Sequence, residues 1–332
     1  MNSAPEQRRR IAVVGCGALG SYYGAKLCRD AQDVHFLLRS DFDTVRRNGV
    51  TIRSRDGDFN VRPNCARRPQ EIGPCELVLI GLKSTANHRF GELLPPLVHE
   101  HTAVLTLQNG LGNEEALAEL FPPEQILGGL CFVCLNRTEP GVVEHMDHGR
   151  IVLGEFRRRP QPRTQDLAAM FQHAGVPCKV ADNLAQAHWE KLIWNVPFNG
   201  LGVASVTGLD ALLGGPLGPT PIGPCLTTDR LLADPAWEAL VLELMLEIIH
   251  AAQALGFAVP EKLAQVNIDR TRTMGAYKAS TVVDYERGQP IELRALFLEP
   301  LRQAQQAGVA TPRLAALARV LQAVAPKGSE PS

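Results

Sequence analysis

The chain has 332 residues, of which 45% are hydrophobic and 21% are charged, and its formal net charge is −1. A chain of this length exceeds the usual size of one hydrophobic core, so two domains are expected. The balanced charge favours neither nucleic acid nor a membrane surface as a partner, and a small molecule is expected instead.

The first predicted elements form a dinucleotide-binding fingerprint. Residues 10–15 predict a short buried strand, which runs into a glycine-rich turn and then a helix over residues 21–29. The residues of this turn are Gly15, Cys16, Gly17, Ala18, Leu19 and Gly20. Gly15 permits the tight turn, Gly17 lets a pyrophosphate approach the backbone, and Gly20 lets helix and strand pack closely. Amides at the helix start would bind the phosphates.

The second predicted strand, residues 33–39, indicates which dinucleotide is bound. NAD-binding proteins usually end this strand with an acidic residue that binds the ribose 2′-hydroxyl. Here the strand ends in Arg39, whose guanidinium can bind a 2′-phosphate in bidentate fashion, so NADP is favoured over NAD. Asp41 and Asp43 follow closely and keep NAD as the alternative.

Two further strands are predicted at residues 76–82 and 103–107, and polar residues follow each of them. In a doubly wound sheet, ligands bind at the carboxyl ends of the strands. Lys83 follows the third strand and could bind a phosphate or a substrate carboxylate. Asn109 lies in the elbow, residues 108–112, and could orient a nicotinamide or a carbonyl. The alternative for the elbow is a plain turn, because Asn-Gly is a common turn pair.

A polar stripe marks the second half of the chain. Lys191, Asn195 and Asn199 recur every fourth residue, and residues four apart share a face of a helix. The residues between them are apolar and suit a buried helix. Burial disfavours the charged form of a lysine, which makes Lys191 a candidate proton donor. The alternative is an ordinary amphipathic helix with its polar face in water.

These patterns predict an α/β Rossmann domain with a doubly wound parallel sheet over residues 1–181 and an all-α domain over residues 182–332. The first domain would bind NADP, and the second would hold the substrate and a homodimer interface. Residues 236–255 are very apolar but contain three glutamates, so we expect them in the domain core or a dimer interface and not in a membrane. Glycine and proline in residues 213–224 predict an irregular insertion or a mobile flap. Residues 325–332 are expected to be a disordered tail.

The ordered set of motifs resembles the ketopantoate reductase (2-dehydropantoate 2-reductase) family along nearly the whole chain. The matching residues are Gly15 to Gly20, Arg39, Lys83, residues 108–112, Lys191, Asn195, Asn199, Ser280, Asp284 and Glu292. The resemblance implies an NADPH-dependent, cytoplasmic enzyme that reduces a 2-oxo acid to a 2-hydroxy acid, ketopantoate to pantoate in pantothenate biosynthesis.

The resemblance also implies the roles of individual residues. Lys191 would be the general acid, Glu292 would orient the substrate, and Asn109 would serve the nicotinamide side. The substrate-binding residues would be Asn195, Asn199, Ser280 and Asp284. The chemistry suits these residue types independently, because an ammonium stabilises the negative charge that develops on a carbonyl oxygen and then protonates it. Taken singly, Ser280 could be a helix-start residue and Glu292 a first-turn carboxylate.

Several positions depart from the family pattern on the expected substrate side. Tyr277 and Phe297 stand where asparagine is frequent, and Ile291 stands where threonine is common. Each change removes a polar group or enlarges an apolar one, so a bulkier or less polar oxo acid is an alternative substrate. A non-catalytic NADP(H)-binding regulator is the other alternative, which Lys191 and Glu292 disfavour because a sensor needs no proton donor.

One cysteine pair has the spacing of a metal site. Cys131 and Cys134 are separated by two residues, but no second pair or histidine cluster follows them. We therefore expect both cysteines in a strand or in the core, and we expect no metal.

Overall fold

The chain divides into two compact units. The computed structural model describes residues 8–218 and 222–329. The first unit comprises Met1–Gln108 and Asn113–Leu184, and the second comprises Asn109–Gly112 and Ala185–Ser332. The sequence places one boundary at residue 181 and does not indicate that four residues of the elbow belong to the second unit.

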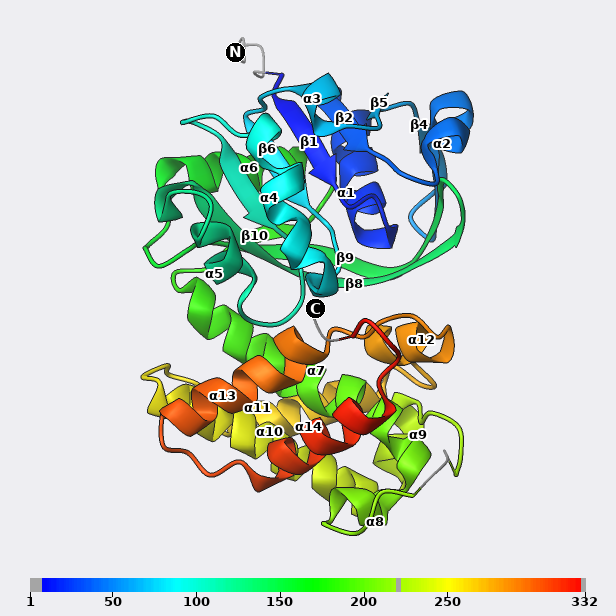
Figure 1. The fold of residues 1–332 in the computed structure, drawn as a ribbon, viewed down its shortest axis with the longest axis vertical. Coiled ribbons are helices and arrows are strands. Elements are labelled where there is room, and N and C mark those ends of the chain that lie inside the picture. The colour runs from blue at the N-terminus through cyan, green and yellow to red at the C-terminus, as the bar shows by residue number, and fades with distance from the viewer. Residues whose placement is uncertain (1–7, 219–221, 330–332) are drawn as a thin grey trace. The chain divides into compact units, whose positions relative to one another are not determined.

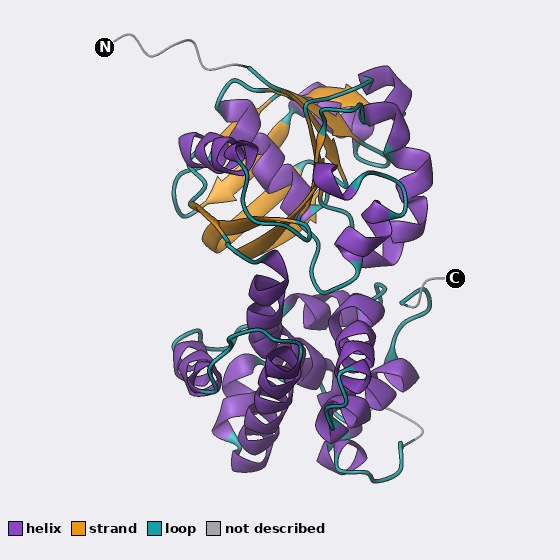
Figure 2. Ribbon diagram, turned by 90° about the vertical axis from the view of Figure 1, so that its left-hand side faces the viewer, coloured by secondary structure: helices purple, strands orange, loops and turns teal. Residues whose placement is uncertain are grey.

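The first unit is built on one mixed, mainly parallel sheet, and the second is helical (Figure 1 and Figure 2). The strand order is β4-β3-β9-β8-β7-β6-β1-β2-β5, with β10 beside β9. The strands are β1 (Arg10–Val14), β2 (Asp33–Leu37), β3 (Val50–Ser54), β4 (Phe59–Val61), β5 (Asn64–Ala66), β6 (Leu77–Ile80), β7 (Ala103–Thr106), β8 (Ile126–Glu139), β9 (Val142–Glu155) and β10 (Cys178–Val180). The helices are α1 (Ala18–Arg29), α2 (Phe42–Asn48), α3 (Pro69–Ile72), α4 (Phe90–Leu93), α5 (Asn113–Ala118) and α6 (Pro162–His173).

The middle of this sheet confirms the Rossmann prediction. The four expected strands are β7, β6, β1 and β2, which lie side by side and pair in parallel. Alternate residues of β1 enter two different cores, Ile11 and Val13 on one face and Ala12 and Val14 on the other. A strand that is apolar on both faces is typical of a sheet with helices on both sides.

The long hairpin of β8 and β9 was not predicted. Its pairing is antiparallel and has register shifts after Phe132, Cys134 and Arg137. Each shift interrupts the two-residue alternation by which a strand is recognised in a sequence. Cys131 and Cys134 are both buried in β8, and all eight cysteines of the chain lie in the described residues as free thiols.

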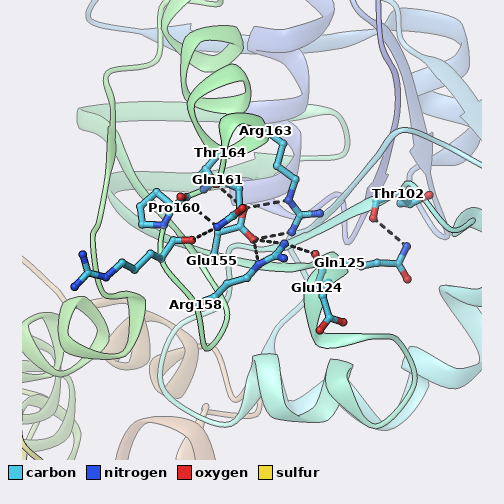
Figure 3. A network of polar contacts seen from close by, with 10 residues as sticks. Thr102, Glu124, Gln125, Glu155, Arg158, Pro160, Gln161, Arg163 and Thr164 are labelled. Atoms are coloured by element: carbon cyan, nitrogen blue, oxygen red, sulfur yellow. Dashed lines mark hydrogen bonds and ion pairs between the residues drawn. The ribbon is translucent and has the colours of Figure 1, made fainter.

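A buried carboxylate fixes the end of this hairpin to the start of α6 (Figure 3). Glu155 accepts hydrogen bonds from Arg163 Nη2 at 2.7 Å, from Arg158 Nη2 at 3.0 Å and from the Thr164 hydroxyl at 2.5 Å. Burial by itself raises the pKa of Glu155, but the hydrogen bonds from Arg163 and Thr164 outweigh it and hold the pKa below its ordinary value.

The second unit has helices and no strand among its described residues. The helices are α7 (Leu184–Ala204), α8 (Leu209–Leu212), α9 (Thr228–Ala233), α10 (Pro235–Ala254), α11 (Lys262–Arg272), α12 (Ser280–Glu286), α13 (Glu299–Gln306) and α14 (Pro312–Val324), with a π-helical turn at Arg294–Leu298. Val241, Leu244 and Ile248 of α10 are fully buried in the core of this unit, which settles the position of that apolar helix. In the described ranges, no helix combines the length and hydropathy needed to span a membrane.

The end of the chain differs from the sequence-based expectation. Ser329 is buried, and its hydroxyl accepts a hydrogen bond from the buried Ile291 amide at 3.0 Å. The expected disordered tail is therefore wrong for residues 325–329, because a buried amide needs an acceptor and Ser329 provides it. Residues 330–332 lie outside the described residues. The stretch 213–224 has no helix or strand where it is described, and its residues 219–221 are not described.

Candidate active site

The three glycines in the turn between β1 and α1 differ in what a side chain at each position would contact. Gly15 has a φ of +93°, and a Cβ there would lie 2.6 Å from the carbonyl carbon of Gly81. A Cβ on Gly20 would collide with the carbonyl oxygen of Gly15. A Cβ on Gly17 would meet no described atom within 4 Å, so a ligand can approach the backbone there.

The start of α1 suits the phosphates of a dinucleotide. The helix begins directly after Gly17 without a side-chain cap and without an acidic residue in its first turn. Unsatisfied amides and the helix dipole favour an anion at such a terminus. Sequence reasoning missed Gly81, where a Cβ would lie 2.9 Å from the Gly15 oxygen and from the Gly20 Cα. Its only sequence signal is a glycine directly after a buried strand.

The loop after β2 separates Arg39 from the two nearby carboxylates. Arg39 is exposed, and its side chain makes no hydrogen bond or ion pair with the described residues. Asp41 is buried and lies 2.7 Å from the Arg137 guanidinium. Asp43 pairs with Arg67 at 2.8 Å. The carboxylates that keep NAD as an alternative are thus engaged by protein groups, whereas the Arg39 guanidinium is accessible to a phosphate.

A polar network within the first unit joins Gln108 and Asn113, the two residues that flank residues 109–112 of the elbow. Gln108 is buried, and its Oε1 accepts a hydrogen bond from the Thr106 hydroxyl at 2.8 Å. Its amide donates to Asn87 Oδ1 at 2.7 Å, and Asn87 Nδ2 donates to Asn113 Oδ1 at 2.9 Å. Asn87 was missed, because no periodicity or motif marks it in the sequence. Lys83 is exposed and directly precedes the 3₁₀ helix that carries Asn87.

The polar stripe of α7 is largely buried. Asn195 and Asn199 are only 7% and 2% exposed, and Lys191 is half-buried. The alternative of an amphipathic helix with its polar face in water is therefore wrong at both asparagines. The helix continues unbroken through Pro197, whose missing amide hydrogen deprives the Ile193 carbonyl of its usual donor.

Asn109 connects the lysine of α7 to a buried glutamate within the second unit. Lys191 Nζ donates a hydrogen bond to Asn109 Oδ1 at 2.8 Å. Asn109 Nδ2 lies 3.5 Å from Glu292 Oε2, and Glu292 is only 3% exposed. An ammonium, a carboxamide and a carboxylate from three distant segments thus form one chain of contacts.

Asn199 connects α7 to the start of α12. Its Oδ1 accepts hydrogen bonds from the Thr281 amide at 2.9 Å and from the Ser280 hydroxyl at 3.3 Å. Ser280 is exposed, and Asp284 lies one turn further along α12. Asn195 lies on α7 between Lys191 and Asn199. It makes no hydrogen bond with the described residues, so its carboxamide can bind a ligand. Asn199 follows Lys191 by eight positions, which is about 12 Å along the helix.

The fold and these side chains define a two-part oxidoreductase, with a Rossmann unit for a dinucleotide and a helical unit that carries a lysine and a glutamate. Residues 11–158 match the model of the family described as ketopantoate reductase PanE/ApbA, and residues 220–325 match the model of its C-terminal part. The chain belongs to this family, whose enzymes depend on a pyridine nucleotide.

Individual relatives agree with this assignment. The chain is 38% identical over 312 residues to a 2-dehydropantoate 2-reductase of Nostoc sp., with 92% of each chain covered. A crystal structure of 2-dehydropantoate 2-reductase from Geobacter metallireducens has a TM-score of 0.86 and 47% identity, and covers 95% of this chain and 99% of its own. The corresponding structure from Methylococcus capsulatus has a TM-score of 0.82 and 32% identity, and covers 94% and 96%.

Proposed function

We propose that the protein reduces 2-dehydropantoate to pantoate with NADPH. The observation that carries this proposal is the contact chain from Lys191 through Asn109 to Glu292. In this proposal Lys191 is the proton donor and the buried Glu292 is an acceptor. Both lie in the same unit as the side-chain carboxamides of Asn195 and Asn199. The names of the family and of its relatives support the same substrate.

The side chains suit the two ends of such a substrate. The bound nicotinamide supplies the hydride for the carbonyl carbon. Lys191 binds the carbonyl oxygen, stabilises its developing negative charge and protonates it. Glu292 accepts a hydrogen bond from the substrate hydroxyl and orients it. The remaining substrate-binding residues in the proposal are Asn195, Asn199, Ser280 and Asp284.

We assign NADPH rather than NADH as the cofactor because of the side chains around Arg39. Its guanidinium is accessible, while Asp41 is paired with Arg137. The phosphates would bind the glycine turn, residues 15–20, and Lys83 would assist them. Asn109 would bind the nicotinamide side. In this assignment residues 1–181 bind the cofactor and residues 182–332 bind the substrate.

A larger, apolar 2-oxo acid is the second candidate substrate. Tyr277 lies three residues before Ser280, and its ring centroid lies 6.2 Å from that of Trp194 on α7. Both rings are half-buried and so present aromatic surface beside the polar stripe. Phe297 does not support this candidate, because it is fully buried in the core.

A panel of 2-oxo acids tests both candidates. NADPH oxidation is measured with 2-dehydropantoate, with pyruvate and with aromatic and branched 2-oxo acids. The highest kcat/KM with 2-dehydropantoate is expected. A higher kcat/KM with an aromatic acid would replace the first candidate by the second, and no turnover with any acid would contradict both.

Two further parts of the proposal concern the cellular location and the oligomeric state of the protein. The free thiols of all eight cysteines support a reducing, cytoplasmic location. The proposed homodimer is tested by light scattering on the same preparation, where the mass of a single chain would contradict it.

A further inference from the structure

The helix that follows Glu292 has a backbone carbonyl without a helical donor. Residues Arg294–Leu298 form a π-helical turn, and the Glu299 amide donates to the Arg294 carbonyl five residues earlier. The next residue is Pro300, which has no amide hydrogen. The Ala295 carbonyl could accept from residue 299 in an α-helix or from residue 300 in a π-helix, and neither donor is available to it.

The elbow supplies the missing donor. The Leu111 amide donates to the Ala295 carbonyl at 2.9 Å, and both residues belong to the second unit. A buried carbonyl needs such a partner, so the π-turn and the elbow are complementary. A π-turn is often found at a functional position, and here its consequence is a docking point for another segment.

The approach is so close that only glycine fits beside it. Gly110 has a φ of +84°, and a Cβ there would lie 2.5 Å from the Ala295 carbonyl carbon and 2.8 Å from its Cβ. Gly112 has a similar φ of +88°, but a Cβ there would meet only Glu299 Cγ, at 3.8 Å. The two glycines thus share a positive φ and differ in the contact with the π-turn.

We propose that this contact of Gly110 and Leu111 with Ala295, which we call the elbow latch, positions Asn109 and through it Lys191 for proton transfer. Asn109 immediately precedes the latch, and its carboxamide holds the Lys191 ammonium at 2.8 Å. Gly110 and Leu111 are therefore positioning residues that do not touch the substrate. The proposal rests on the proposed function, because it assumes that Lys191 is the proton donor.

The matched pair Gly110→Ala and Gly112→Ala tests the latch. Both variants force an alanine into a left-handed conformation, but only Gly110→Ala pushes against the π-turn. A displacement of about 1 Å at a catalytic group can cost on the order of 10² in rate. We expect Gly110→Ala to lower kcat at least about tenfold more than Gly112→Ala, with similar KM values for NADPH. Equal kcat values for the two variants would overturn the proposal.

Amide exchange of Leu111 tests the latch without any activity measurement. In the wild type and in Gly112→Ala, the Leu111 amide should be protected from hydrogen exchange by its bond to Ala295. In Gly110→Ala that protection should be lost, while the core helix α10 stays protected. An unprotected Leu111 amide in the wild type would refute the latch, even if Lys191 proves to be the proton donor.

A double-mutant cycle shows whether the latch acts through Asn109. Gly110→Ala should have little further effect on kcat in an Asn109→Ala background, because the two changes remove one arrangement. Additive losses would contradict this route. If Lys191→Ala retains full kcat while Leu111 exchange behaves as expected, the proposed function fails and the role of the latch in proton transfer fails with it.

Pro300→Ala provides a variant that does not strain the fold. It restores an amide at position 300, which can then compete with Leu111 for the Ala295 carbonyl. We expect faster exchange of the Leu111 amide and a lower kcat, with a modest loss of unfolding stability because Pro300 is buried. Unchanged exchange and kcat in a folded Pro300→Ala would contradict the origin assigned to the latch.

Discussion

At the scale of single residues, the protein engages some ionic groups and leaves others accessible. Asp41 pairs with Arg137, which is 96 residues away in the sequence, whereas Arg39 is exposed. Lys191 contacts a neutral carboxamide and is connected through it to Glu292. The two cations, Arg39 and Lys191, are thus the residues whose removal should separate cofactor recognition from chemistry.

Lys191→Ala should slow the chemical step and leave cofactor binding intact. We expect kcat to fall by about 10²–10⁴, the range for a lost general acid. The dissociation constant of NADPH should change little, because the proposed phosphate-binding residues lie in the first unit. Steady-state kinetics and fluorescence titration measure the two quantities. The control is Lys262→Ala, which removes an exposed lysine of α11, and a wild-type kcat in Lys191→Ala would disprove the assignment.

Arg39→Ala should weaken NADPH binding and spare NADH binding. The lost charge-assisted contact should cost about 1.5–3 kcal/mol, or about 10- to 150-fold in affinity. Both cofactors are titrated against the wild type, Arg39→Ala and Arg53→Ala, which removes an exposed arginine of β3 in the same unit. Equal affinities of the wild type for NADH and NADPH would show that Arg39 does not read the 2′-phosphate.

At the scale of elements, a buried carboxylate, Glu155, and a half-buried one, Glu247, connect segments that local sequence patterns do not link. Glu155 joins the end of β9 to the first turn of α6 (Figure 3). Glu247 of α10 accepts the amides of Arg313 and Leu314, each at 2.8 Å, at the start of α14. Burial raises the pKa of Glu247, whereas the hydrogen bonds to Glu155 lower its pKa. Ionisation of Glu155 as the pH rises should therefore stabilise the folded protein, whereas ionisation of Glu247 should destabilise it.

The pH dependence of unfolding should report Glu155. Its folded-state pKa lies below its ordinary value of 4.5, so its contribution is complete above pH 4.5 and is lost as the pH falls through the folded pKa. Removing one partner of a buried ion pair costs about 3–5 kcal/mol, so Glu155→Gln should be strongly destabilised at neutral pH. The difference from the wild type should shrink on acidification in denaturant titrations. A difference that is constant with pH would contradict the assignment.

Glu247→Gln is the matched control, because the pKa shift of Glu247 has the opposite direction to that of Glu155. Its folded-state pKa is raised above the ordinary value of 4.5, so its ionised form is disfavoured by folding above that pKa. Neutralisation by glutamine should therefore not produce the loss on acidification that marks Glu155. A parallel pH profile for the two variants would show that general acid unfolding dominates both.

At the scale of the whole molecule, the chain passes from the first unit to the second at the elbow, returns, and passes again at α7. The proposed phosphate-binding residues lie in the first unit, while Lys191, Asn109 and Glu292 lie in the second. NADPH at 100 times its dissociation constant should stabilise the folded protein by about 2.7 kcal/mol. Hydrogen exchange with and without NADPH should show a larger gain in protection at residues 15–20 than in α10. Protection confined to α10 would contradict the assignment of the first unit.

Local sequence patterns were sufficient to predict the elements whose residues show a recognisable periodicity or motif. The strands β1, β2, β6 and β7 are short and continuously apolar, and the glycine turn has a fixed spacing, so both are visible along the chain. The stripe on α7 was found in the same way, because its period is that of a helix. By contrast, the register shifts in the hairpin of β8 and β9 interrupt its period, and that hairpin was missed.

What the amino-acid sequence determined by itself is the class of fold, the family and the residue types of the candidate site, because these depend on spacing within short segments. Only the tertiary structure decided which unit holds Asn109, that Asn87 contacts both Gln108 and Asn113, and that Asp41 is paired. The tertiary structure alone also showed that the Ala295 carbonyl has no helical donor and accepts from Leu111 instead. Each of these features is a contact between residues far apart in the chain, and no local periodicity records such a contact.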